Sequence, residues 1–266
     1  MTPNIDAVTA LIRDVAADEI VPRFRNLAAH DVLEKRVGDL VTAADTGAER
    51  ALTERLSDIL PGSRVVGEEG VADDPTLLGR LEEPGPVWVV DPLDGTVNFA
   101  GGLPIFAVMV ALVEQGRTVA GWIHDPVHDM TATAALGQGA WLGDTRVTLN
   151  APDELGRMSG ALHTRFGDRD RAAHLARRSS ALASALDLHC AGMEYLGLLL
   201  GRLHFAVYPR AYPWDHLAGA LLIAEAGGHV ARTDGRPYEA TGRTTAAPLL
   251  VAANETCWQT VRREFF

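Results

Sequence analysis

The run of four apolar residues at 87–90 leads directly into a polar segment, residues 91–96, with the sequence Asp-Pro-Leu-Asp-Gly-Thr. The apolar run predicts a short buried strand that ends at Asp91. Pro92 fixes its own φ and biases Asp91 toward extended geometry, and Gly95 permits a tight turn or a close approach of the backbone to a ligand. A buried strand should therefore end in a turn that carries two carboxylates three residues apart.

This turn could hold a hard cation. Mg²⁺ prefers carboxylate, carbonyl and water oxygens, and Asp91, the Leu93 carbonyl, Asp94 and the Thr96 hydroxyl could supply several of them from one loop. The alternative is an ordinary solvated turn, because Asp, Pro and Gly are common turn residues. The segment alone leaves both interpretations open.

Three further acidic groups stand at the edges of predicted buried elements. Glu68 follows an apolar strand candidate, Asp45 stands where a helix should begin, and Asp215 opens an apolar helix. Asp45 and Asp215 could each be a helix N-cap. A shared role as metal ligands accounts for all these groups together better than four separate caps and turns do.

The net charge of −11 over 266 residues sets a further condition. An acidic chain repels nucleic acid, anionic membranes and phosphorylated substrates at long range, so a phosphate site would need bound cations or local basic residues. No basic start followed by an apolar run and no long apolar stretch is present, and two cysteines give no disulfide framework. We therefore expect a cytoplasmic protein that binds neither nucleic acid nor membrane directly.

Periodicity and turn signals predict an α+β chain with a soft subdivision near residue 150, between 1–150 and 151–266. The expected helices cover residues 3–29, 45–60, 169–185, 191–201, 215–226 and 254–265. The expected strands cover residues 63–66, 87–90, 104–113, 118–123, 205–208 and 249–253, with another pair within 130–149. Residues 71–86 are expected to form a weakly ordered connection, and 151–165 are ambiguous.

Four blocks, in this order and spacing, resemble the signature of the inositol monophosphatase family. They are Val41–Asp45, Gly67–Glu69, Asp91–Phe99 and Trp214–Gly219, the last with Glu225–Gly228. The resemblance spans nearly the whole chain. It implies a layered αβαβα sandwich, a single domain over 1–266, and usually a homodimer. It also implies Mg²⁺-dependent hydrolysis of small phosphate monoesters such as inositol monophosphate or a related sugar or polyol phosphate, often inhibited by Li⁺.

By matching position, the resemblance also implies roles for individual residues. Glu68, Asp91 and the Leu93 carbonyl would hold one metal, Asp91, Asp94 and Asp215 a second, and a third, weaker ion would also use Glu68. Thr96 and Asp45 would help to activate the attacking water. The substrate would meet Asp94 and the amides of Gly95 and Thr96, with Ala191 and Tyr208 in the pocket.

The pocket segment departs from the family pattern. His189 and Cys190 precede Ala191 where many members have small residues, and Tyr208 stands where many have an acid that bonds sugar hydroxyls. The alcohol therefore stays open. Histidinol phosphate, fructose 1,6-bisphosphate, a nucleotide 3′-phosphate and NADP are alternatives, as is an additional protein-binding role in transcription.

Several other residues have competing interpretations. The four residues His124, Asp125, His128 and Asp129 have metal-like spacing, but Pro126 favours a turn over a metal site. Lys35 and Arg36 are expected on a solvated surface rather than at a phosphate. His216 is either a neighbour of the metal ligands or part of a plain helix start, and Cys190 is expected to be a small pocket or core residue.

Overall fold

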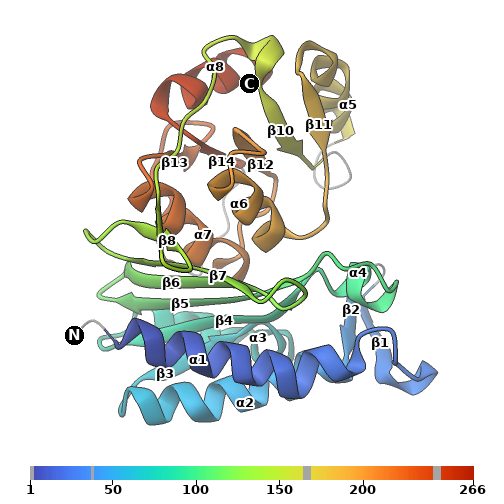
Figure 1. The fold of residues 1–266 in the computed structure, drawn as a ribbon, viewed down its shortest axis with the longest axis vertical. Helices are drawn as coiled ribbons and strands as arrows, with labels where there is room; N and C mark the ends of the chain where they lie inside the picture. Colours follow the sequence, from blue (N-terminus) through green and yellow to red (C-terminus); the bar gives the residue numbers. More distant parts are fainter. Residues whose placement is uncertain (1–2, 37–38, 164–168, 242–246) are drawn as a thin grey trace.

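The computed structural model describes residues 3–36, 39–163, 169–241 and 247–266. Figure 1 shows five layers, in which two long helices, a large sheet, a helix pair, a smaller sheet and outer helices lie on one another. The layers contain α1 (Ile5–Val15) and α2 (Ala43–Ile59), then β3–β9, then α6 (Ala191–Leu199) and α7 (Pro213–Glu225), then β10–β14, and finally α5 (Arg169–Arg178) and α8 (Glu255–Phe265). The αβαβα arrangement expected from the sequence is confirmed.

The larger sheet has seven strands in sequence order, with β3 and β4 parallel and every other neighbouring pair antiparallel. Its strands are β3 (Arg64–Gly67), β4 (Val87–Asp94), β5 (Ala107–Glu114), β6 (Arg117–Asp125), β7 (Met130–Ala135), β8 (Ala140–Leu142) and β9 (Thr145–Val147). The hairpin expected between the strands at 104–113 and 118–123 is present, and its turn residues Gln115 and Gly116 both have positive φ. Two such residues in sequence suit the tight turn between twisted antiparallel strands.

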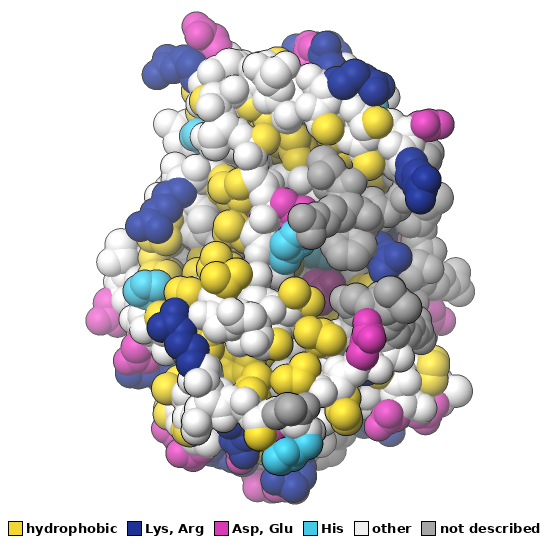
Figure 2. All heavy atoms as spheres, turned by 90° about the vertical axis from the view of Figure 1, so that its right-hand side faces the viewer, with side chains coloured by type: hydrophobic (Ala, Val, Ile, Leu, Met, Phe, Trp, Pro, Cys, Tyr) yellow, Lys and Arg dark blue, Asp and Glu magenta, His cyan; other side chains and the backbone are white. Residues whose placement is uncertain are grey.

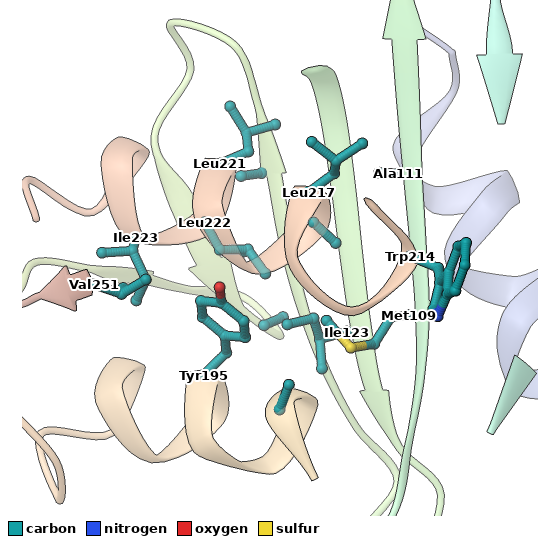
Figure 3. Close-up of a cluster of buried hydrophobic side chains, with 14 of the residues drawn as sticks. Met109, Ala111, Ile123, Tyr195, Trp214, Leu217, Leu221, Leu222, Ile223 and Val251 are labelled. Carbon is teal, nitrogen blue, oxygen red and sulfur yellow. The ribbon is translucent and has the colours of Figure 1, made fainter. Parts of the chain in front are cut away.

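Both faces of this sheet are covered, which explains why its central strands are continuous apolar runs. Trp88 and Val90 of β4 pack toward α1 and α2, whereas Val89 packs with α6 and α7 on the other face. Figure 3 shows Leu217 and Leu221 of α7 lying over the strands and Tyr195 of α6 facing α7. The helix pair thus belongs to the core that also fixes the end of β4.

The smaller sheet has the order β11-β10-β12-β14-β13. Its strands are β10 (Ser159–Leu162), β11 (Ser184–Leu186), β12 (Phe205–Tyr208), β13 (His229–Arg232) and β14 (Leu249–Ala252). The first three are parallel, and β14 is antiparallel to both of its neighbours. The two sheets come from segments before and after residue 150, and their shared helix layer joins them.

Two short elements complete the side of the molecule where the polar turn lies. The hairpin of β1 (Val32–Arg36) and β2 (Asp39–Thr42) and the short helix α4 (Thr96–Ala100) lie next to each other there (Figure 1). Within the described residues, no helix is both long and apolar enough to cross a membrane.

Several predicted boundaries are wrong. The helix expected over 3–29 is α1 followed by a π-helical turn (Ala16–Ile20) and a 3₁₀ turn (Val21–Arg23), where Pro22 cannot donate a backbone hydrogen bond. The connection expected at 71–86 contains α3 (Glu68–Asp73) and a 3₁₀ helix (Pro75–Glu82). The helix expected over 169–185 ends at Arg178 and gives way to a 3₁₀ turn (Ser179–Ala181) and β11.

Some elements were not predicted. They are the β1–β2 hairpin, α4, β13, a 3₁₀ turn at Ala29–Asp31, and, in the ambiguous stretch, a 3₁₀ turn (Leu155–Arg157) and β10. Each is five residues or shorter, too short for hydrophobic periodicity to register.

Candidate metal-dependent active site

The polar turn begins inside β4 rather than after it. The strand continues through Asp94, and its register against β5 shifts between Asp91 and Asp94. The prediction that the strand stops at Asp91 is therefore wrong. A shift of this kind bends a strand and redirects its side chains, and the Leu93 amide donates to Asp91 Oδ1 at 3.0 Å instead of to β5.

Gly95 makes the reversal that follows. Its φ of +89° is a left-handed conformation that side chains disfavour. A Cβ there would also lie 2.7 Å from the Ile105 carbonyl oxygen, so the backbone can approach only because the residue is glycine. Helix α4 starts directly afterwards at Thr96.

Asp91 is the most deeply buried of the four proposed metal-ligating side chains. Its side chain is buried, with 1% exposed. Burial and then the charges of Glu68, Asp94 and Asp215 raise the pKa of Asp91 well above its usual value. Burial, Glu68 and Asp94 likewise raise the pKa of Asp215. The four predicted metal-ligating side chains are therefore close enough to repel one another.

Asp215 and Asp45 are not N-caps. Tyr212 caps α7, whose first residue is Pro213, so Asp215 is the third residue of the helix. Thr42 caps α2, and Asp45 is its capping-box partner. Asp45 Oδ2 accepts from the Thr42 amide at 2.8 Å and from the Thr42 hydroxyl at 2.5 Å.

The second oxygen of Asp45 reaches the polar turn. Asp45 Oδ1 lies 3.0 Å from the Thr96 hydroxyl, which lies equally far from the Leu93 carbonyl oxygen. Asp45 is fully buried, and burial raises its pKa. The Thr96–Asp45 pair inferred from the resemblance is thus in hydrogen-bond contact.

Glu68 begins α3 and has a basic neighbour. The Lys35 ammonium lies 3.2 Å from Glu68 Oε1 and 3.0 Å from Glu69 Oε1, with 16% of the lysine side chain exposed. Burial raises the pKa of Glu68 to about 8 against the opposing effect of Lys35. The expectation that Lys35 is a solvated surface residue is wrong, and the side chain of Arg36 lies outside the described residues.

Asp94 is held from the opposite side by the start of α6. The Gly192 amide donates to Asp94 Oδ2 at 2.5 Å, and Cys190 Sγ lies 3.2 Å from the same oxygen. Burial raises the pKa of Asp94 to about 6 although the Gly192 and Cys190 hydrogen bonds lower it. Cys190 is buried, as expected for a small pocket or core residue.

A family model described as the inositol monophosphatase family matches residues 2–264. The chain belongs to the inositol monophosphatase family. Inositol monophosphatase 2 of Solanum lycopersicum is 33% identical over 80% of this chain and 82% of its own length. The fructose-1,6-bisphosphatase/inositol-1-monophosphatase of Thermotoga maritima is 32% identical over 79% and 78%. A Thermotoga maritima IMPase structure superposes with a TM-score of 0.83 at 26% identity, covering 98% of this chain and 96% of that one.

This membership confirms the predicted fold and the predicted enzyme class, a phosphomonoester hydrolase. The donor set also fits the divalent cation that the inositol monophosphatase family implies. Carboxylate and carbonyl oxygens are the ligands of Mg²⁺, and mutually repelling buried carboxylates are stabilised by a bound cation.

Tyr208, which the resemblance places in the substrate pocket, is buried in the structure. Its side chain is 3% exposed, with its ring 5.1 Å from that of His163 and 4.4 Å from that of His216. Burial and then Glu194 raise its pKa, yet its hydroxyl finds no partner of normal hydrogen-bond geometry among the described residues. Contact between Tyr208 and a substrate stays a prediction.

His216 is buried, with its ring next to that of Tyr208. Its Nδ1 lies 3.2 Å from the Tyr195 hydroxyl and its Nε2 3.1 Å from the Arg210 carbonyl oxygen. Burial lowers the pKa of His216 to about 3, so its ring is neutral. The residue packs and hydrogen-bonds beside Asp215 rather than adding a charge.

His124 and Asp125 end β6, and His128 and Asp129 lie in the turn that follows. Asp125 Oδ2 pairs with His128 Nδ1 at 2.6 Å, Asp129 pairs with Arg13, and His124 Nδ1 lies 2.9 Å from the Thr131 hydroxyl. Each group has a protein partner that suits a turn, as expected.

Sequence reasoning missed two acids near the pocket, Asp187 and Glu194. Both lie within reach of His163, and Glu194 is fully buried. A glutamate inside the apolar helix 191–201 was the available signal, because glutamate is almost never fully buried unless it is paired.

Proposed function

We propose that this chain is a Mg²⁺-dependent phosphatase of small phosphorylated alcohols of the sugar or polyol type. The observation that carries the proposal is the convergence of Glu68, Asp91, Asp94 and Asp215, whose pKa values are all raised. Four acids whose burial and mutual repulsion raise their pKa values, in a chain that is already acidic, are best explained as ligands of a cation. Bound cations would also give the site the positive charge that attracts a phosphate.

The residues divide into three groups. Glu68, Asp91 and the Leu93 carbonyl would hold one ion, and Asp91, Asp94 and Asp215 a second, with Glu68 shared by any third. Bound Mg²⁺ supplies charge neutralisation and a lower pKa for coordinated water. Thr96 and Asp45 would orient the attacking water and accept its proton, while the Gly95 and Thr96 amides would position the phosphate.

A panel of phosphate esters tests the activity and the choice of alcohol together. Inositol 1-phosphate, histidinol phosphate, fructose 1,6-bisphosphate, a nucleotide 3′-phosphate and NADP would each be assayed with and without Mg²⁺. We expect Mg²⁺-dependent phosphate release, with a sugar or polyol phosphate giving the highest kcat/KM. No turnover of any ester would contradict the proposal.

The finer assignments rest on the resemblance. Inhibition by Li⁺, a homodimer and a cytoplasmic location stay predictions. A protein-binding role in transcription also stays a prediction, and retention of a partner by Asp94→Asn would show that such a role is independent of catalysis.

A further inference from the structure

The segment that departs from the family pattern contains an aspartate–histidine pair. Asp187 Oδ1 lies 3.1 Å from His189 Nδ1 and accepts from the His189 amide at 3.1 Å. The side chain of His189 is 30% exposed and that of Asp187 is 17% exposed. With its Nδ1 directed at the carboxylate, the ring has its Nε2 left for another partner.

A second histidine holds Asp187 in place. His163 Nδ1 lies 3.2 Å from Asp187 Oδ1, and His163 Nε2 lies 2.9 Å from Glu194 Oε2. Glu194 Oε1 in turn accepts from the Leu188 amide at 3.0 Å. Burial opposes the charge on His163, but Glu194 and then Asp187 raise its pKa. His163, with one carboxylate at each ring nitrogen, therefore fixes the carboxylate that orients His189.

The pair adjoins the proposed phosphate site through the next residue. Cys190 Sγ lies 3.2 Å from Asp94 Oδ2, and a Cβ on Gly95 would lie 3.2 Å from Cys190 Cβ. The His189 Cα is one residue, about 3.8 Å, from that of Cys190, so His189 lies next to the segment that contacts Asp94 and Gly95. Asn98 Nδ2 also donates to the Leu188 carbonyl at 2.8 Å, which ties this segment to α4.

Figure 2 shows the face that carries α4, where a histidine side chain and acidic side chains lie near one another at the middle. His189 also has a positive φ of 50°, a conformation that is uncommon for residues other than glycine but that histidine, asparagine and aspartate adopt more often than the rest.

We propose that His189 is the proton donor to the leaving alcohol and that Asp187 orients it. The inference rests on the phosphatase function proposed above. Water forms the new bond to phosphorus and gives its proton to the Thr96–Asp45 pair. As the bond between phosphorus and the ester oxygen breaks, its electron pair goes to that oxygen, which takes the proton from His189 Nε2. The alcohol leaves neutral, and the proton that Asp45 releases to solvent balances the one that the imidazole takes up from solvent.

Leaving-group chemistry provides the test, because an alkoxide needs a proton donor and a phenolate with a low pKa does not. Two variants suit the left-handed backbone, His189→Asn and His189→Gly. Each would be compared with the wild type on inositol 1-phosphate and on p-nitrophenyl phosphate at saturating Mg²⁺. We expect a loss of about 100-fold or more in kcat on the alkyl ester, in the range of general acid catalysis, and little change on the aryl ester.

Two further measurements separate chemistry from structure. Added imidazole should restore part of the turnover of His189→Gly on the alkyl ester, and the Mg²⁺ affinity of both variants, measured by calorimetry, should equal that of the wild type. His128→Ala is the matched control, because His128 makes the same kind of pair with Asp125 outside the site. This control should leave turnover of both esters unchanged.

Equal losses on both esters, or no loss on either, would overturn the role of His189. Those outcomes would leave the proposed function standing, because the wild type would still hydrolyse both esters. If the wild type hydrolyses neither of these esters nor any ester of the panel above, the proposed function itself fails, and the role of His189 fails with it.

Discussion

Asp91 in β4 and Asp215 in the first turn of α7 carry carboxyl groups that are close enough to interact, since the charge of Asp215 raises the pKa of the buried Asp91. Two like charges in such a site repel one another. A divalent cation between the two carboxylates would offset that repulsion, so this relationship links the fold to the proposed metal site.

The Asp91→Asn substitution should separate stability from function. It removes one charge from a crowded group, so the metal-free protein should unfold at an equal or higher temperature. Its affinity for Mg²⁺ should fall by at least about tenfold, and phosphate release should be abolished. Calorimetric titration and thermal unfolding check both parts. A variant with near-normal turnover would refute the ligand assignment.

Stability of the metal-free protein should depend on pH in a defined direction. Glu68 has a folded pKa of about 8, Glu69 about 7 and Asp94 about 6. All exceed the unfolded values near 4, so the unfolded chain loses these protons first as pH rises, and these groups destabilise the fold increasingly between about pH 4 and 8. Tm in EDTA should therefore fall across that range, and Mg²⁺ should raise it more at pH 8 than at pH 5.

Lys35 should weaken metal binding in this site. Its ammonium lies 3.2 Å from the Glu68 carboxylate and would repel an ion held there. Lys35→Met should therefore tighten Mg²⁺ binding by about tenfold, or about 1.4 kcal/mol. Arg55→Met is the control, since Arg55 pairs with Asp14 on the surface. Weaker binding in Lys35→Met would show that the lysine supports the site instead.

The Thr96 hydroxyl should matter for the rate and not for metal affinity. Thr96→Val keeps the shape of the side chain but removes the group between Asp45 and the Leu93 carbonyl. We expect kcat to fall by about 10²- to 10⁴-fold, as for loss of acid–base assistance, with the Mg²⁺ affinity nearly unchanged. Unchanged kcat in steady-state assays would exclude Thr96 from water activation.

Gly192 should tolerate no side chain. A Cβ there would lie 2.8 Å from Ala107 Cβ and 3.2 Å from Asp94 Oδ2, so Gly192→Ala should displace Asp94 or α6. Both Tm and phosphatase activity should decrease. Gly79→Ala, which meets no atom within 4 Å, is the control and should behave as the wild type. A fully active Gly192→Ala enzyme would mean that the contact with Asp94 is dispensable.

The long elements and the group of acidic residues were predicted from the sequence more accurately than the local geometry around them. Apolar runs and helical periodicity located α7 and the central strands, because burial on both faces imposes those patterns. The end of β4 was placed too early in the chain, at Asp91 instead of Asp94, since a register shift leaves no hydrophobic signal. Lys35 was misplaced for a related reason: its partners, Glu68 and Glu69, are 33 and 34 residues away, beyond any local pattern.

Pocket residues were the hardest to predict. The roles given to Ala191 and Tyr208 came from position in a family pattern, whereas the structure buries Tyr208 and exposes part of His189. Asp187, His163 and Glu194 meet only because β10, α6 and the segment before α6 converge in three dimensions. Such a network depends on tertiary contacts, and the one signal of it in the sequence was Glu194 within an otherwise apolar helix.

Phosphate release from inositol 1-phosphate, measured with Mg²⁺ and again after its removal by EDTA, tests the central claim most directly. The site of four converging acids predicts turnover with Mg²⁺, loss of turnover in EDTA, and recovery when Mg²⁺ is restored. Turnover that persists unchanged in EDTA, or phosphate release by Asp94→Asn at the wild-type rate, would contradict a metal-dependent site built on these residues.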